Sequence, residues 1–122
     1  MSYNWGPYFI VPSEVLKSYS GKVLLREHFD EDLLAKELEE LGLAGYSRAA
    51  VNPWYYRRKN SETWIKIGES WDQKNNFSVP WDTGNLENGE FEVLGLMHVV
   101  IKKEDREVVI ARQNIVTITV KN

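Results

Sequence analysis

Two histidines, His28 and His98, are the only imidazole groups in the chain, and there is no cysteine. Without cysteine there are no disulfide bonds, no thiolate nucleophile and no zinc site built on thiolates, and the redox compartment stays undetermined. No Gly-x-Ser-x-Gly, Walker or dinucleotide-binding fingerprint occurs, and neither histidine stands near a serine in a recognisable catalytic context. The sequence thus shows no set of residues for nucleophilic catalysis. We expect a protein that is not an enzyme and holds no cofactor.

Carboxylates and aromatic rings near residue 80 are the next candidates for chemistry. Asp82 and Glu87 carry the oxygen ligands that calcium prefers, but Asp82 is better placed to bond local backbone at the end of a strand. Trp81 alternates with Phe77 and Val79, so we expect it to face a core and not to stack on a ligand. No metal site is expected here.

Length and charge limit the class of protein. With 122 residues the chain is long enough for one hydrophobic core, so we expect a single domain over residues 1–122. Charged residues make up 27% of the chain and the net charge is -3, which does not favour a nucleic-acid partner. No long apolar run predicts membrane insertion. We expect a cytoplasmic protein if Met1 is the native start, and an extracellular or cell-surface one if the chain is an excised domain.

Most of the chain alternates apolar and polar residues between turn-forming residues, which is typical of short strands. An irregular arm over residues 1–7 precedes them, and glycine at the Asn88–Gly89 turn would supply a positive φ. The predicted strands lie at residues 8–11, 20–29, 49–59, 64–67, 77–82, 91–102 and 108–120.

One segment has helical periodicity instead. Asp30 can cap a helix over residues 30–41, in which Leu34, Leu38 and Leu41 recur at helical spacing. This stripe of leucines needs an apolar surface to pack against.

Several segments, taken in order, resemble the bacterial and archaeal immunoglobulin-like modules, which look like fibronectin type III domains in outline. The resemblance implies an antiparallel sandwich, and in the family such modules are usually non-catalytic spacers, adhesins or appendages of larger proteins. The segment 30–46 departs from the pattern, because the family has a short connection there. The similar segments are Ser20-Gly-Lys-Val-Leu-Leu, Tyr55-Tyr-Arg with Trp64, Phe77-x-Val-x-Trp-Asp-Thr, Asn88-Gly-Glu-Phe and Ile115-Val-Thr-Ile-Thr-Val.

The pattern of such sandwiches implies where three titratable side chains point. His28 and His98 would point outward from strands of opposite sheets, so they would share neither a metal nor a proton. Glu27 would point inward, where an unpaired carboxylate is costly, so we expect an Arg or Tyr partner or a position at the end of the core. The functional alternative is a general acid with a raised pKa, although no second carboxylate stands at a predictable distance.

The other face of residues 91–102 is unusually apolar. Leu94, Leu96 and Val100 flank His98 where a solvated sheet face would carry polar residues. We expect the inserted helix to cover this face. The alternatives are an adjacent domain, a protein partner or a second copy of the chain.

Aromatic residues outside the inward pattern give a second candidate surface. Trp5, Tyr55 and Trp71 could stack on sugar rings if they lay in one plane. The chain has five Trp and six Tyr, but we expect most of them to wedge loops against the sandwich.

Together these features predict an all-β, immunoglobulin-like antiparallel sandwich of about seven strands with one inserted α-helix. We expect a non-catalytic structural or protein-interaction module, an accessory domain or subunit of a larger protein or assembly. The alternative is a carbohydrate-binding module that uses exposed Trp and Tyr, and a small enzyme built on Glu27 follows well behind.

Overall fold

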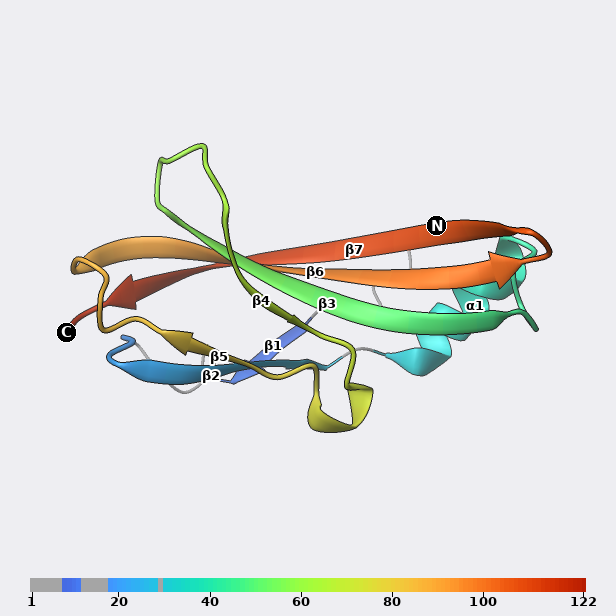
Figure 1. Ribbon diagram of the computed structural model, residues 1–122, viewed down its shortest axis with the longest axis horizontal. Coiled ribbons are helices and arrows are strands. Elements are labelled where there is room, and N and C mark those ends of the chain that lie inside the picture. Colours follow the sequence, from blue (N-terminus) through green and yellow to red (C-terminus); the bar gives the residue numbers. More distant parts are fainter. Residues whose placement is uncertain (1–7, 12–17, 29) are drawn as a thin grey trace.

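The computed structural model describes residues 8–11, 18–28 and 30–122, with side chains from residue 18 onward except that of residue 28. It is a mainly β protein with two antiparallel sheets and one short helix (Figure 1). The smaller sheet has the order β1-β2-β5, and the larger has the order β4-β3-β6-β7. Their strands are β1 (Tyr8–Val11), β2 (Lys22–His28), β5 (Val79–Asp82), β4 (Ile65–Ser70), β3 (Ser47–Arg58), β6 (Gly89–Lys103) and β7 (Arg106–Val120).

Each predicted strand has a counterpart, and all but the first differ from it at one or both ends. The predicted strand at 77–82 begins two residues late, because Phe77 has a φ of 52° and cannot be extended backbone. Gly89 has the expected positive φ, at 144°. Pro53 lies beside a register shift between β3 and β4, as a residue without a backbone donor often does.

The two sheets face each other across a first hydrophobic cluster. Trp81 is buried from β5, as predicted, and its ring centroid lies 5.2 Å from that of Tyr56 on β3. Burying such rings is a large part of what holds the sheets together, at about 25 cal/mol per Å² of apolar surface. The buried members are Tyr19, Leu25, Trp54, Val79, Trp81, Phe91, Val93, Ile118 and Val120.

Helix α1 (Glu31–Glu40) begins as predicted. The carboxylate of Asp30 accepts the backbone N–H groups of Asp32 and Leu33, which satisfies two donors that the first turn leaves free. At the other end of the helix, the prediction that Leu41 belongs to the packed leucine stripe is wrong. Leu41 is 54% exposed, and Leu43 is buried in its place.

The helix covers the same face of the larger sheet as the smaller sheet does, but farther along the strands (Figure 1). Leu34 and Leu38 pack in a second hydrophobic cluster with Met97, Val99 and Ile101 of β6. The expectation that the helix would cover the opposite face of β6 is therefore wrong. The inward side chains of β6 alternate from Phe91 and Val93 on to Ile101. Leu34 and Leu38 pack against the later members of this inward row. The residues that the helix leaves uncovered are Leu94, Leu96, His98 and Val100.

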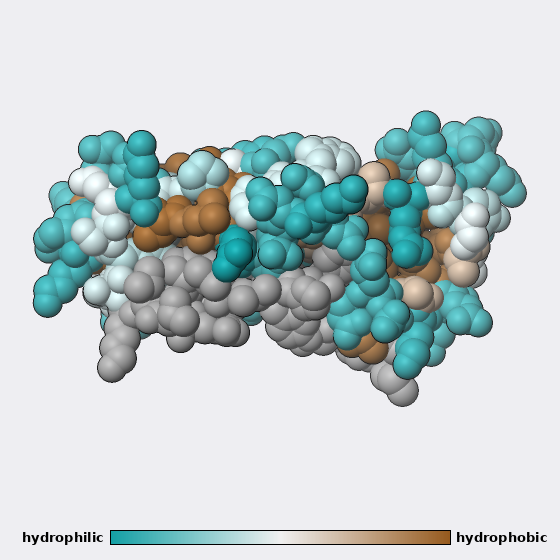
Figure 2. Space-filling model, turned by 90° about the horizontal axis from the view of Figure 1, so that it is seen from below, coloured by the Kyte–Doolittle hydropathy of each residue, from teal (hydrophilic) through white to brown (hydrophobic). Residues whose placement is uncertain are grey.

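An ion pair fastens the helix to the sheet. Arg112 of β7 binds the largely buried carboxylate of Glu37. Seen from the side of the smaller sheet (Figure 2), hydrophilic side chains predominate outside the grey area, and hydrophobic ones gather in separate patches.

Candidate functional site

The two histidines lie on strands of different sheets. His98 is on β6, half-buried on the outer face of the larger sheet, meaning the face turned away from the smaller sheet. His28 ends β2 in the smaller sheet, and its side chain lies outside the described residues. The prediction that they belong to opposite sheets is confirmed.

Glu27 is the most unusual titratable group in the described part of the chain. Its side chain points inward from β2, as predicted, and is 0% exposed. No described Arg or Tyr is its expected partner, since neither carboxylate oxygen has a hydrogen bond to the residues that the structure describes. Desolvation by burial raises the pKa of Glu27 to about 9, so the carboxyl is protonated at neutral pH.

A pocket of about 390 Å³ opens beside Glu27. We call it the acidic pocket, because Asp30, Glu31 and Asp32 at the start of α1 also line it. Gln73, in the short 3-10 helix η1 (Gln73–Asn75), donates a hydrogen bond of 2.7 Å to Glu31 and ties that turn to α1.

The third wall of the acidic pocket is the pair Asn76 and Phe77. Both have a positive φ, 55° and 52°, which asparagine adopts more readily than most residues but which is rare for a bulky side chain such as that of Phe77. Hydrogen bonds hold this backbone, because the N–H of Glu27 donates to the carbonyl of Asn76 at 3.0 Å and the N–H of Phe77 donates to the carbonyl of Asp72 at 3.0 Å. The wall therefore has a fixed shape.

The outer face of the larger sheet carries the predicted interface residues. Leu94 is buried there between its cross-strand neighbours Tyr55 and Ile115. Val100 lies between Ala49 and a Val109 side chain that is 53% exposed. The face is thus apolar over several cross-strand pairs, as the sequence predicts.

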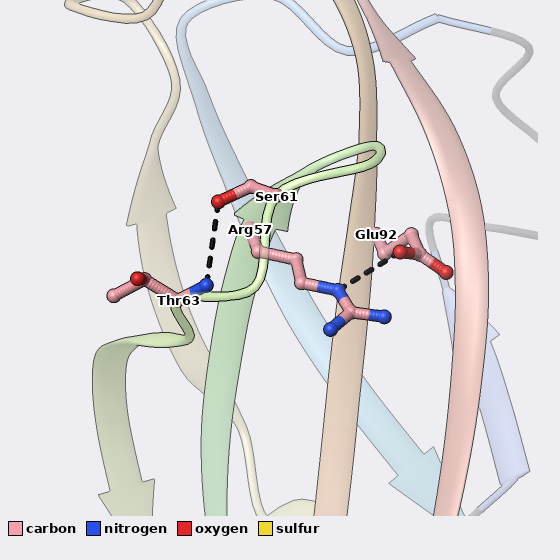
Figure 3. Close-up of polar contacts among 4 residues, drawn as sticks. All are labelled: Arg57, Ser61, Thr63 and Glu92. Carbon is pink, nitrogen blue, oxygen red and sulfur yellow. Dashed lines mark hydrogen bonds and ion pairs between the residues drawn. The ribbon is translucent and has the colours of Figure 1, made fainter.

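The apolar surface of this outer face ends at a group of polar side chains. Arg57 and Glu92 form an ion pair of 2.9 Å across β3 and β6 (Figure 3). The same guanidinium lies 4.2 Å from the ring centroid of Trp64. In the adjoining hairpin the backbone N–H of Thr63 donates a hydrogen bond of 3.3 Å to the hydroxyl oxygen of Ser61. The apolar surface therefore runs the other way, toward Val100.

At that other end, part of β3 has an open edge. Residues 52–56 of β3 pair with β4, but residues 47–51 pair with β6 alone among the described strands. The chain leaves β4 at Trp71, whose side chain is 58% exposed. The backbone groups of residues 47–51 that point away from β6 thus have none of the described strands beside them.

Two hollows flank the open edge. The outer hollow, of about 320 Å³, is lined by Ala49, Trp71 and Val100 together with the charged residues Arg48, Lys102 and Glu107. The inner hollow, of about 250 Å³, lies on the other face of β3. It is lined by Leu34, Ala50, Gln73 and Val99.

Of the three residues predicted to stack on sugars, the two that the structure describes do not line the same hollow. Trp5 lies outside the described residues. Tyr55 is half-buried beside Leu94 and does not line the outer hollow, whereas Trp71 does. Trp71, predicted to bind sugars, and Val100, predicted to lie in a protein interface, line the same outer hollow.

Some site residues had no signal in the sequence. Arg48 and Ala49 matter because β4 stops short of them, which depends on strand lengths. Gln73 reaches Glu31 across 42 positions of the chain. Asn52 is fully buried on the inner face, with neither side-chain polar atom bonded, and alternation could indicate its direction but not its burial.

No group of three or more His, Asp or Glu residues in the described ranges is arranged to hold a metal ion. Glu87, considered above for calcium, instead pairs with Arg58 at 2.9 Å. Asp82 accepts the backbone N–H of Gly84, the local contact that the sequence predicts. None of the helices described is long and apolar enough to cross a bilayer. A scan against protein-family models finds no matching family, and a search of curated proteins finds no relative.

Proposed function

We propose that the chain is an immunoglobulin-like, non-catalytic interaction module that binds an extended segment of a partner protein at the open edge of β3. The strand orders β1-β2-β5 and β4-β3-β6-β7 support an immunoglobulin-like sandwich, since they place the first, second and fifth strands opposite the others. Helix α1 is then an insertion between the second and third strands.

The observation that carries this function is the mismatch in length between β3 and β4. Twelve residues form β3 and six form β4, so β4 cannot cover residues 47–51. An unpaired strand edge offers alternating N–H and C=O groups, which another strand can complete.

The flanking hollows specify the kind of segment. Successive side chains of an added strand point to opposite faces of the sheet. One side chain would therefore enter the outer hollow, and the next would enter the inner hollow. The outer hollow has an apolar wall at Val100 and Trp71. The inner hollow is mixed, because the polar side chains of Glu31, Arg48 and Gln73 line it beside Ala50. Ala49 and Ala50 leave room because their side chains are small.

Selection of random peptides on the immobilised protein, followed by nuclear magnetic resonance, tests this function. Selected peptides should carry an apolar residue on the face of the outer hollow and should shift the amide resonances of residues 47–51 and the indole resonance of Trp71. Ala49→Arg, which fills the outer hollow, should weaken binding by about tenfold or more. Thr117→Arg, exposed on β7 of the same sheet, should leave it unchanged.

Peptides that shift only the resonances of other strands contradict the proposal. So does equal affinity for the Ala49→Arg variant. If light scattering instead finds a dimer that Ala49→Arg dissociates, the occupant of the edge is a second copy and not a partner protein.

Carbohydrate binding is the second candidate, and Trp71 favours it. An exposed ring beside Arg48, Lys102 and Glu107 combines a stacking surface with hydrogen-bonding groups. A glycan array would distinguish the two functions. Binding of a polysaccharide that the Trp71→Ala variant no longer binds would support the carbohydrate-binding function. Absence of binding to every glycan on the array would contradict it.

A further inference from the structure

We propose that the acidic pocket is a second binding site, which takes a guanidinium or ammonium group and holds it on the carboxylate of Glu27. Glu31 and Gln73 line both this pocket and the inner hollow, but the proposal does not rest on the open edge of β3. It rests on a buried side chain without a partner, on the pocket beside that side chain and on the charges around it.

The buried carboxyl is the first step. A polar group removed from water without a hydrogen bond destabilises the folded state, so proteins rarely retain one that has no other purpose. Both oxygens of Glu27 are in this condition, and the residue lines a pocket of about 390 Å³. Neither oxygen is exposed to water, so the Glu27 side chain would have to turn toward the pocket for a ligand there to satisfy both oxygens at once.

The charges around the pocket select the sign of the ligand. Asp30, Glu31 and Asp32 line the same pocket as Glu27, while its other described side chains are the neutral Gln73, Asn76 and Phe77. No described Lys or Arg lines it. The start of α1 carries a partial positive charge, but the Asp30 carboxylate accepts two of its N–H groups, and Glu31 and Asp32 add negative charge beside it. The pocket therefore favours a cation.

The arrangement fits an organic cation better than a metal ion. The described carboxylates are not grouped closely enough to coordinate a metal, and the pocket is much larger than a bare ion. A guanidinium presents N–H groups in a fork that matches two carboxylate oxygens, and an ammonium offers three donors. Either group could reach Glu27 while Asp32, which is exposed, attracts it at the rim.

Binding of a cation would be coupled to proton release. In the empty pocket burial keeps Glu27 protonated at neutral pH, and a cation would stabilise the ionised form. The proton lost from the carboxyl would pass to solvent. Asp30, Glu31 and Asp32 face the same space from α1, and only neutral side chains face it from η1 and the residues after it.

Calorimetric titration with N-acetyl-arginine amide tests the site. Binding should occur near neutral pH with release of about one proton, measured from the dependence of the heat on the ionisation enthalpy of the buffer. N-acetyl-citrulline amide, which has the same shape without the charge, should not bind. Equal binding of the two, or binding without proton release, overturns the proposal.

Two variants and a matched control locate the site. Glu27→Gln should weaken binding by about tenfold or more, the loss expected for a charge-assisted hydrogen bond. Glu62→Gln makes the same change on the exposed β3–β4 hairpin and should alter nothing. Circular dichroism would show whether Glu27→Gln folds. If it does not, Asp32→Asn at the exposed rim is the second variant. It should bind the ligand more weakly, and unchanged binding would contradict the proposal.

Further titrations identify the source of the cation. Tighter binding of an arginine-containing tripeptide than of agmatine indicates a side chain of a partner protein, and the reverse indicates a small free amine. Calcium chloride is the contrary case, because binding of calcium with no response to any organic cation overturns the proposal.

Discussion

The indole Nε1 of Trp54 donates a buried hydrogen bond of 3.0 Å to the backbone carbonyl oxygen of Phe77. Trp54 lies on β3 in the larger sheet, and Phe77 lies just before β5 in the smaller one. The first residue belongs to the cluster between the sheets and the second to the cluster under the helix. This bond therefore joins both sheets and both parts of the core at one point, beside the wall of the acidic pocket.

Replacing Trp54 by Phe should destabilise the protein by about 2–4 kcal/mol. The substitution removes the donor to the Phe77 carbonyl and leaves a cavity where the larger indole packed. Chemical denaturation would measure the loss. Trp71→Phe is the matched control, because that ring is 58% exposed and its removal should change the free energy of unfolding by less than about 0.5 kcal/mol.

The helix offers a comparison between two leucines of the same predicted stripe. Leu38 is 1% exposed and Leu41 is 54% exposed. Leu38→Ala should cost about 2–5 kcal/mol, and Leu41→Ala should cost less than about 0.5 kcal/mol. Equal losses in thermal unfolding would mean that α1 does not pack on β6 as the second cluster requires.

Strand positions and parity could be predicted because they depend on local patterns. Alternation indicated that Trp81 and Glu27 point inward and that Leu94 and His98 share a face, and short-range capping chemistry indicated Asp30. These features need only the residues beside them.

The position of the helix could not be predicted in the same way. The sequence shows that Leu34 and Leu38 need a surface, but both faces of β6 are apolar, and the choice depends on how far the smaller sheet reaches along the larger one. Similarly, Gln73 meets Glu31 only because η1 and α1 come together in three dimensions. The predicted strands at 49–59 and 64–67 already differ in length, but the extent of the open edge of β3 depends on where β4 ends, and β4 continues to Ser70, past the predicted end at Gly68.

The titration of Glu27 makes the stability of the protein depend on pH. Burial raises its pKa from an ordinary value of 4.5 to about 9. Between these values the folded protein holds a proton that the unfolded chain has released. The stability that comes from protonated Glu27 is therefore fully present below about pH 4.5, and it is lost as the pH rises toward about 9.

Glu27→Gln should remove this dependence, because an amide does not titrate. The difference in free energy of unfolding between the original chain and the variant should fall by up to about 1.4 kcal/mol per pH unit across that window and should level above it. Taking the difference cancels the contributions of Asp30, Glu31 and Asp32, which both proteins share. Urea denaturation at a series of pH values would measure it. A difference that stays constant from pH 5 to pH 9 would mean that Glu27 is ionised in the folded protein and that its carboxylate has a partner or water contact.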